Sequence, residues 1–379
     1  MNEQSVEKKV IRSMIHESEK QAYTGHQTVA RKHDLGHRAQ VEMALNFEKP
    51  YRTPVQNFSN ITAVHSGGYQ FKDARTNATL SAKLALRFAK LTHSDFVKPA
   101  LDTNGQLIDI GLNIKQPDDN YGRAVSSLIN EPEDVDRLEL YDPFNPKECP
   151  YFTKGFVENI RMVSDTMDED FHVLGMSWGP FTTAAYIRGA ENIMMDINLD
   201  PDLIKKLVAK TAEFCERIQM RCIDAGATAL WMSDPTASED MISTDMYREF
   251  ALKGTKRVCT NVKKETKVPI FVHMCGESSE TMQLLPDAGV ECFSCDSKVN
   301  LAIARKNIGK KMAIMGNIDP VRVLWQGTPQ TIRDTAFKCI DDAGQEGGFI
   351  LAPGCESPRD CSDENMIAMG MAGIDYWMR

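Results

Sequence analysis

The chain has 379 residues, of which 42% are hydrophobic, so it is long enough to bury a large core. Its formal net charge is -9 with both signs scattered along the chain, which argues against nucleic acid as a partner. No apolar run approaches the roughly 20 residues that cross a bilayer, and the charged N-terminal stretch is unlike a signal peptide. We therefore expect a cytoplasmic protein that contacts neither nucleic acid nor membrane and whose ten cysteines are mostly free thiols.

Short apolar runs recur along the chain, and each ends in a polar, aromatic or glycine-containing turn. Segments with helical apolar spacing lie between them, such as residues 202–226 and 329–344. The predicted strands are residues 53–59, 95–102, 171–178, 229–234, 268–275, 291–296, 311–317 and 349–354. This alternation predicts an α/β fold, a single (β/α)8 TIM barrel over residues 38–379. Residues 1–37 are predicted to form an N-terminal helical extension packed on the barrel.

The fifth predicted strand ends in His273-Met274-Cys275-Gly276. TIM-barrel enzymes place their chemistry at the carboxyl ends of the strands, and side chains two residues apart on an extended segment point the same way. The last strand ends in FILAPGCESP and brings Cys355 to the same rim. One nitrogen and two sulfurs form a zinc ligand set of the soft kind, and three protein ligands leave a fourth position open for substrate.

The alternative interpretation is a core histidine beside buried thiols, which a His-x-Cys pair alone would favour. A third ligand at the same rim favours the zinc site. Cys361, in a polar loop, competes with Cys355 as a ligand, but nothing in its surroundings favours metal binding. Cys295 lies next to the rim and is interpreted, with Cys292, as packing in the barrel wall.

The runs HMCG, PDAGVECFSCD, MGNIDP and APGCESP, in a barrel preceded by RAQVEMALNFEKPYRTPV, resemble the uroporphyrinogen decarboxylase superfamily. The closest resemblance is to its zinc-dependent corrinoid methyltransferases, and it spans the chain from about residue 38. It implies that His273, Cys275 and Cys355 hold zinc. It also implies an enzyme that exchanges a methyl group between a corrinoid (methylcobalamin), carried by a separate protein, and a thiol such as coenzyme M. The chain lacks the Asp-x-His-x-x-Gly corrinoid-binding motif, which agrees with a separate corrinoid protein as partner.

Three other functions stay open. One is demethylation of a methylthiol, halomethane or methyl ether onto the corrinoid protein, and another is a non-catalytic zinc-binding partner of that protein. The third is uroporphyrinogen decarboxylation, which is disfavoured because residues 57–71 contain no arginine where the decarboxylases carry an arginine-rich segment. The direction of transfer and the pairing of two chains as a homodimer are not fixed by the sequence.

Other rim positions complete the predicted site. In related enzymes an acidic side chain near the position of Asp296 approaches the metal, so we predict a catalytic role for Asp296, as a labile fourth ligand or as the partner that orients His273. The alternative for Asp296 is the N-cap of the following helix. Glu356, beside Cys355, is interpreted as a solvated loop carboxylate in preference to an outer partner of the metal. Substrate contacts are predicted, from position at strand ends, for Asn57, Asp102, Trp178, Asp234 and Asn317.

Overall fold

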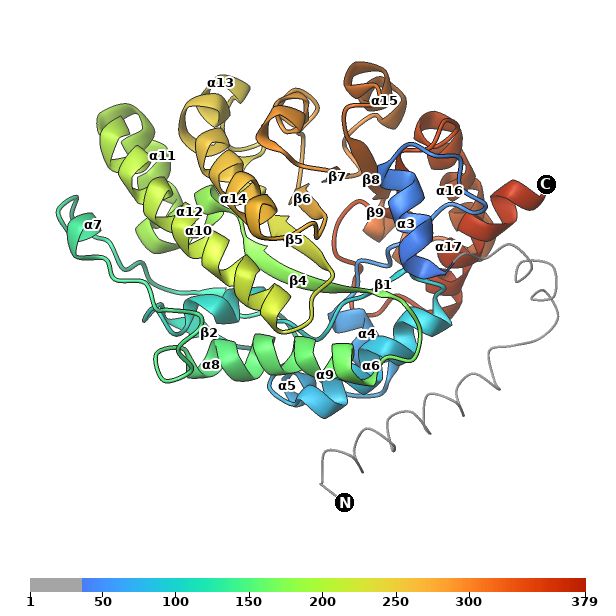
Figure 1. Ribbon diagram of the computed structural model, residues 1–379, viewed down its shortest axis with the longest axis horizontal. Coiled ribbons are helices and arrows are strands. Elements are labelled where there is room, and N and C mark those ends of the chain that lie inside the picture. Colours follow the sequence, from blue (N-terminus) through green and yellow to red (C-terminus); the bar gives the residue numbers. More distant parts are fainter. Residues whose placement is uncertain (1–35) are drawn as a thin grey trace.

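A computed structural model describes residues 36–379 of the chain (Figure 1). Its main sheet has seven strands, hydrogen-bonded in the order β1-β4-β5-β6-β7-β8-β9, and every adjacent pair is parallel. The strands are β1 (Phe96–Val97), β4 (His172–Trp178), β5 (Ala229–Ser233), β6 (Ile270–Met274), β7 (Cys292–Cys295), β8 (Ala313–Ile318) and β9 (Phe349–Pro353). The TIM-barrel prediction is confirmed, whereas the predicted extension over residues 1–37 lies almost wholly outside the described residues.

The first predicted strand, residues 53–59, is a single parallel bridge between Val55 and Leu351. It still closes the sheet, because Leu351 N donates to Pro54 O on one side and Asp95 N donates to Val55 O on the other. Regular pairing is prevented because Pro54 has no N–H to donate and the N–H of Val55 binds the Asp95 carboxylate at 2.7 Å. The prediction of a full strand was therefore wrong in extent but correct in position.

Helices surround the sheet (Figure 1). The two helices predicted with bounds are confirmed as α12 (Pro201–Asp224) and α16 (Pro329–Ala343), each with proline at its first position and a capping side chain before it, Asp200 and Thr328. The other helices of eight or more residues are α3 (His37–Leu45), α6 (Ala78–Leu91), α9 (Glu158–Thr166), α10 (Pro180–Arg188), α11 (Ala190–Leu199), α14 (Leu252–Glu265), α15 (Leu301–Ile308) and α17 (Asp363–Asp375). Shorter helices are α4 (Ile61–Ser66), α5 (Phe71–Arg75), α7 (Asp134–Arg137), α8 (Pro150–Phe152) and α13 (Thr244–Met246). Within residues 36–379, no helix has the length and apolar character needed to cross a membrane.

The two ends of the barrel are covered differently. Helix α3 lies at the amino ends of the strands, where Arg38 Nε donates to Phe171 O just before β4 and His37 Nδ1 lies 2.9 Å from Asp95 Oδ1 just before β1. At the opposite end, the chain after β1 forms an antiparallel hairpin of β2 (Ile114–Lys115) and β3 (Arg123–Ala124), which the sequence analysis does not predict. The carboxyl ends of the strands, where the predicted site lies, are thus framed by loops.

Candidate metal centre

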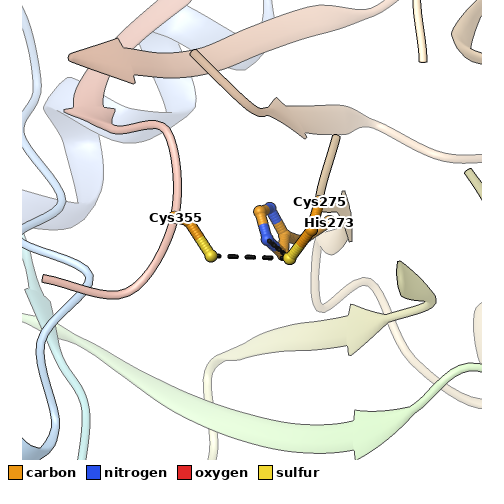
Figure 2. Close-up of side chains that lie close together, drawn as sticks. All are labelled: His273, Cys275 and Cys355. Atoms are coloured by element: carbon orange, nitrogen blue, oxygen red, sulfur yellow. Dashed lines mark hydrogen bonds between the residues drawn. The ribbon is translucent and has the colours of Figure 1, made fainter. Parts of the chain in front are cut away.

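Three side chains converge at the carboxyl end of the barrel (Figure 2). His273 and Cys275 come from the end of β6, and Cys355 from the loop that follows β9. The ligand atoms of all three lie within 4.8 Å of one another, with 3.3 Å from His273 Nε2 to Cys275 Sγ and 3.4 Å from Cys275 Sγ to Cys355 Sγ. Among the described residues, no second group of three or more His, Cys, Asp or Glu residues converges in this way.

Two glycines let the ligand-bearing segments approach. Gly276, directly after Cys275, has φ +81°, a conformation that side chains rarely adopt, and a Cβ there would collide with Asp240. Gly354, directly before Cys355, packs on the backbone of Ser297, and a Cβ there would collide with it. The sequences Cys-Gly and Gly-Cys therefore allow the ends of β6 and β9 to bring their sulfurs together.

The orientation of His273 is fixed by its neighbours. Its Nδ1 lies 3.1 Å from the carbonyl oxygen of Ser294, which can only accept, so Nδ1 carries the proton and donates. Nε2, which then has a free lone pair, faces the two sulfurs. The ring packs edge-on against Phe58, with centroids 4.9 Å apart, and is stacked with Trp231 at 5.7 Å. Nε2 is therefore presented as a metal ligand would be.

The two thiols influence each other. The contact with Cys275 lowers the pKa of Cys355 below its ordinary value, although burial opposes the shift. The same contact, followed by burial, raises the pKa of Cys275 above its ordinary value. The pair therefore holds one thiolate readily, and a cation that binds both sulfurs would remove the repulsion that keeps the second proton in place.

A cavity of about 170 Å³ opens beside the three side chains. Its apolar walls include Phe58, Met176, Trp178 and Pro235. Its other lining residues are Lys98, Thr103, Asn104, Tyr121, Ser233, His273, Cys275, Cys355 and Glu356.

The charges on this wall are paired with each other. Lys98 Nζ lies 2.6 Å from Glu356 Oε2 and 4.9 Å from the centroid of the Phe58 ring, and the Lys98 side chain is only 3% exposed. Glu356 also accepts from Asn60 N at 2.6 Å. The interpretation of Glu356 as a solvated loop carboxylate was therefore wrong, because it lines the cavity, half-buried, in an ion pair with the buried Lys98.

Asp296 follows β7 and contacts the backbone beside a ligand. Its Oδ2 accepts from Gly276 N at 3.0 Å, directly after Cys275, and its Oδ1 accepts from Lys298 N at 3.0 Å. His273 is oriented by Ser294, so the predicted role of Asp296 as the orienting partner of His273 was wrong. The helix after β7 is capped by Asn300, so the alternative role of Asp296 as its N-cap was also wrong. A role close to the metal stays a prediction.

Of the five predicted substrate contacts, Trp178 lines the cavity and the other four do not. Those four carry structural hydrogen bonds: Asn57 to Thr92, Asp102 to Gln116 and Gly122, Asp234 to the N-terminus of α10, and Asn317 to the carbonyls of Asp296 and Val299. Position at a strand end was too coarse a criterion, because neighbouring residues of a strand point to opposite faces. Phe58 and Lys98, which lie in two of the predicted strands, face the cavity instead.

The fold and the site together define a class: a TIM barrel in which one imidazole nitrogen and two sulfurs that could hold a metal ion converge at the carboxyl rim. The family model of uroporphyrinogen decarboxylase (URO-D) matches residues 37–373, and the chain belongs to this family. The predicted resemblance is thereby confirmed.

Curated relatives narrow the class. The chain is 25% identical over 321 residues to a methylcobamide:CoM methyltransferase of Methanosarcina acetivorans, covering 82% of this chain and 90% of that protein. It is 26% identical over 327 residues to a methylated-thiol–coenzyme M methyltransferase of Methanosarcina mazei, covering 86% and 84%. A solved methyltransferase from Methanosarcina mazei shares the fold, with a TM-score of 0.80 at 21% identity over 91% of this chain and 100% of that one. The prediction of a methyltransferase enzyme is confirmed.

Proposed function

We propose that this protein transfers a methyl group between a corrinoid, carried by a separate protein, and a small thiol, at a zinc ion held by His273, Cys275 and Cys355. The observation that carries the proposal is the convergence of one imidazole nitrogen and two sulfurs within 4.8 Å at the carboxyl end of the barrel.

The donor set fits zinc. Nitrogen and sulfur ligands are those that zinc takes in proteins, and three of them leave a position for substrate. The hydrogen bond from His273 Nδ1 to Ser294 O supports this fit, because metal-ligating histidines commonly donate their other ring N–H to a fixed acceptor. When bound, zinc would supply a coordination site for the substrate sulfur and lower the pKa of a thiol there.

The residues of this chain have distinct roles in the reaction. Phe58 and Trp231 hold the imidazole of His273, and Ser294 fixes its proton on Nδ1. The apolar walls exclude water from the substrate sulfur. That sulfur loses its proton to solvent as the thiol binds and then forms the new bond to the methyl carbon, while the electron pair of the broken cobalt–carbon bond stays on cobalt.

The cavity size supports a separate corrinoid carrier. A volume of about 170 Å³ is close to the roughly 150 Å³ that accommodates benzene, so a thiol fits and a corrinoid does not. The corrinoid protein would therefore dock over the cavity mouth.

All ten cysteines are free thiols, which supports a reducing compartment, and we place the protein in the cytoplasm.

A second candidate is the reverse transfer, in which a methylated thiol gives its methyl group to the corrinoid. The apolar walls of Phe58, Met176 and Trp178 are compatible with it, because they suit a thioether as well as a thiol. A relative in this family carries a methylated-thiol activity in its name. Uroporphyrinogen decarboxylation is disfavoured, since Lys98 is the one cation among the described lining residues and is paired with Glu356.

The experiment is turnover of free methylcobalamin by the zinc-loaded protein with a panel of thiols, followed by the absorbance change of the cobalamin. We expect thiol-dependent demethylation that Cys275→Ala abolishes. Methylation of cob(I)alamin by methylated thiols, with release of the free thiol, would favour the second candidate. If the zinc-loaded protein catalyses methyl transfer in neither direction, the proposed catalytic function is contradicted. A role as a non-catalytic partner of the corrinoid protein would then be favoured.

A further inference from the structure

The cavity beside the three ligand side chains has two charged residues in its wall, Lys98 and Glu356, and they are paired with each other. Lys98 Nζ lies 2.6 Å from Glu356 Oε2, and no other lysine or arginine is among the described lining residues. The Lys98 side chain is 3% exposed and the Glu356 side chain 22%, so the ammonium is the more deeply covered of the two. The wall therefore presents no uncompensated positive charge to a ligand.

The Glu356 carboxylate is held in this place by donors from three separate segments. Besides Lys98, which follows β1, Asn60 N donates to Glu356 Oε1 at 2.6 Å from the start of α4. The hydroxyl of Tyr121, in the β2–β3 hairpin, forms a hydrogen bond with the same carboxylate, and its ring packs edge-on against Phe71 with centroids 5.3 Å apart. These charge-assisted hydrogen bonds keep the carboxylate beside Lys98.

An anionic group on the substrate would have no partner in this cavity. Two cysteinate ligands balance the charge of a zinc ion, so a bound substrate thiolate already gives the site one negative charge. A second negative charge, at the far end of the substrate, would lie near the Glu356 carboxylate and among the apolar side chains of Phe58, Met176, Trp178 and Pro235. Taking a charge out of water without a counter-charge is costly, whereas an alkyl chain is stabilised by such walls.

We propose that Glu356 is a specificity-determining residue: by neutralising Lys98, it makes the cavity select small thiols with an uncharged alkyl chain and exclude anionic thiols. This inference rests on the proposed function and names its substrate class. It separates this chain from the relatives whose names carry coenzyme M, because that thiol is a sulfonate.

The test compares thiols of nearly equal shape that differ in charge. 3-Mercaptopropionate carries a carboxylate where 3-methyl-1-butanethiol carries an isopropyl group, and coenzyme M (2-mercaptoethanesulfonate) is a second anionic probe. Binding to the zinc-loaded, full-length protein is measured by calorimetry without corrinoid, and zinc per chain by elemental analysis. We expect the alkyl thiol to bind the wild-type protein about 10-fold or more tightly than either anion, the effect of one unfavourable charge contact at an effective dielectric constant of about 20.

Glu356→Gln keeps an acceptor for Asn60 N and removes the negative charge, so that Lys98 can attract an anion. The ratio of the two affinities should shift toward the anionic thiols by roughly 10- to 50-fold. Comparing this ratio between proteins cancels the intrinsic difference in acidity between the thiols. The double variant Lys98→Gln/Glu356→Gln again has a wall without net charge, so its ratio should return toward the wild-type value.

Glu249→Gln is the matched control, because it removes one carboxylate from an exposed lysine–glutamate pair outside the cavity, 2.7 Å from Lys205. It should leave both affinities unchanged. A purely structural role of Glu356 would weaken the binding of both thiols and leave their ratio as it is in the wild-type protein.

Two outcomes would overturn the inference while the proposed function stands. One is that the wild-type protein binds an anionic thiol at least as tightly as the alkyl thiol, a result that requires no variant. The other is a Glu356→Gln variant whose ratio is unchanged or which loses its zinc, since either would assign Glu356 to holding the site and not to selecting the thiol. If no thiol binds to the zinc-loaded wild-type protein and none demethylates methylcobalamin, the proposed function fails and this inference fails with it.

Discussion

The two ends of the barrel use buried polar groups in opposite ways. At the amino end, the fully buried Asp95 carboxylate accepts from Arg52 Nη1 at 2.8 Å and from Val55 N at 2.7 Å, and it also contacts His37. At the carboxyl end, His273 Nε2 and the sulfurs of Cys275 and Cys355 converge within 4.8 Å of one another. A buried charge whose hydrogen-bond donors are supplied by the chain is costly to leave unpaired, so its partners are needed for the fold. Electron-pair donors that face each other, as the nitrogen and the two sulfurs do here, provide instead a place for a ligand.

This contrast predicts that substitutions at the carboxyl end remove function and leave the fold, with the largest effect at the ligands. Cys275→Ala and Cys355→Ala should each lose most of the zinc and slow methyl transfer by more than the roughly 10- to 100-fold typical of an outer partner of a metal. Elemental analysis measures the zinc content, and far-UV circular dichroism checks that the fold is retained. Cys361→Ala, a buried cysteine outside the cluster, should keep its zinc. Full zinc in both ligand variants would show that the site is misassigned.

The amino end should respond in the opposite sense. Asp95→Asn leaves Arg52 and His37 without their shared carboxylate, and breaking a buried pair of this kind costs about 3 to 5 kcal/mol of unfolding free energy. Zinc per folded chain should stay at the wild-type value. Urea unfolding measures the loss, and Asp245→Asn, at an exposed ion pair, is the control and should change stability little. An Asp95→Asn variant that loses zinc but keeps its stability would contradict the assignment of the amino end to stability and of the carboxyl end to metal binding.

The pH dependence of stability should also come from the amino end. Burial lowers the pKa of His37, but hydrogen bonds to Asp95 and Glu169 outweigh it and raise the pKa to about 9. Because the folded pKa lies above the unfolded value of about 6.5, protonated His37 stabilises the fold at low pH, and this contribution is lost as the pH rises from about 6.5 to 9. The shift corresponds to on the order of 3 kcal/mol.

Unfolding free energies of wild type and His37→Gln between pH 6 and pH 9.5 check this prediction, since the difference between the two isolates the histidine. His172, whose pKa burial lowers to about 4, acts in the window below pH 6.5 and does not interfere. A wild-type curve that runs parallel to the variant across this range would contradict the assignment.

The smallest effect is expected at Asp296, which touches the backbone of Gly276 beside Cys275. Asp296→Asn places an amide where a carboxylate accepts two backbone N–H groups, so the end of β6 should move and zinc affinity should fall by roughly 10-fold. Competition with a chromogenic chelator measures the affinity. Asp319→Asn is the matched control, because Asp319 also accepts backbone N–H groups, from Val321 and Arg322, at a turn outside the cluster. Equal affinities in both variants would leave Asp296 without a role at the metal.

The order of strands and the three ligand candidates follow from local patterns. Parallel barrel strands are buried on both faces, so β5, β6 and β9 appear in the sequence as continuous apolar runs. The period of two along β6 aligns His273 with Cys275, and the carboxyl end of β9 brings Cys355 to the same rim. These signals lie within single strands and require no knowledge of distant contacts.

The rest of the site depends on contacts between distant segments. Lys98 was missed because its partner Glu356 lies 258 positions away, and only their contact turns two ordinary charged residues into a cavity wall. Tyr121 was missed because the β2–β3 hairpin has strands of two residues, too short to show a period. Asp102 was assigned to substrate because it ends a predicted strand, whereas its carboxylate holds the hairpin through Gly122 and Gln116.

The central claim, that His273, Cys275 and Cys355 hold zinc with a position open to sulfur, is tested most directly by zinc-edge X-ray absorption. The free protein should show two sulfur neighbours at about 2.3 Å. Saturation with a thiol that is turned over should raise the count to three and release close to one proton as the thiol binds. A sulfur count that stays at two while methyl transfer proceeds would contradict the claim that the metal binds the substrate sulfur.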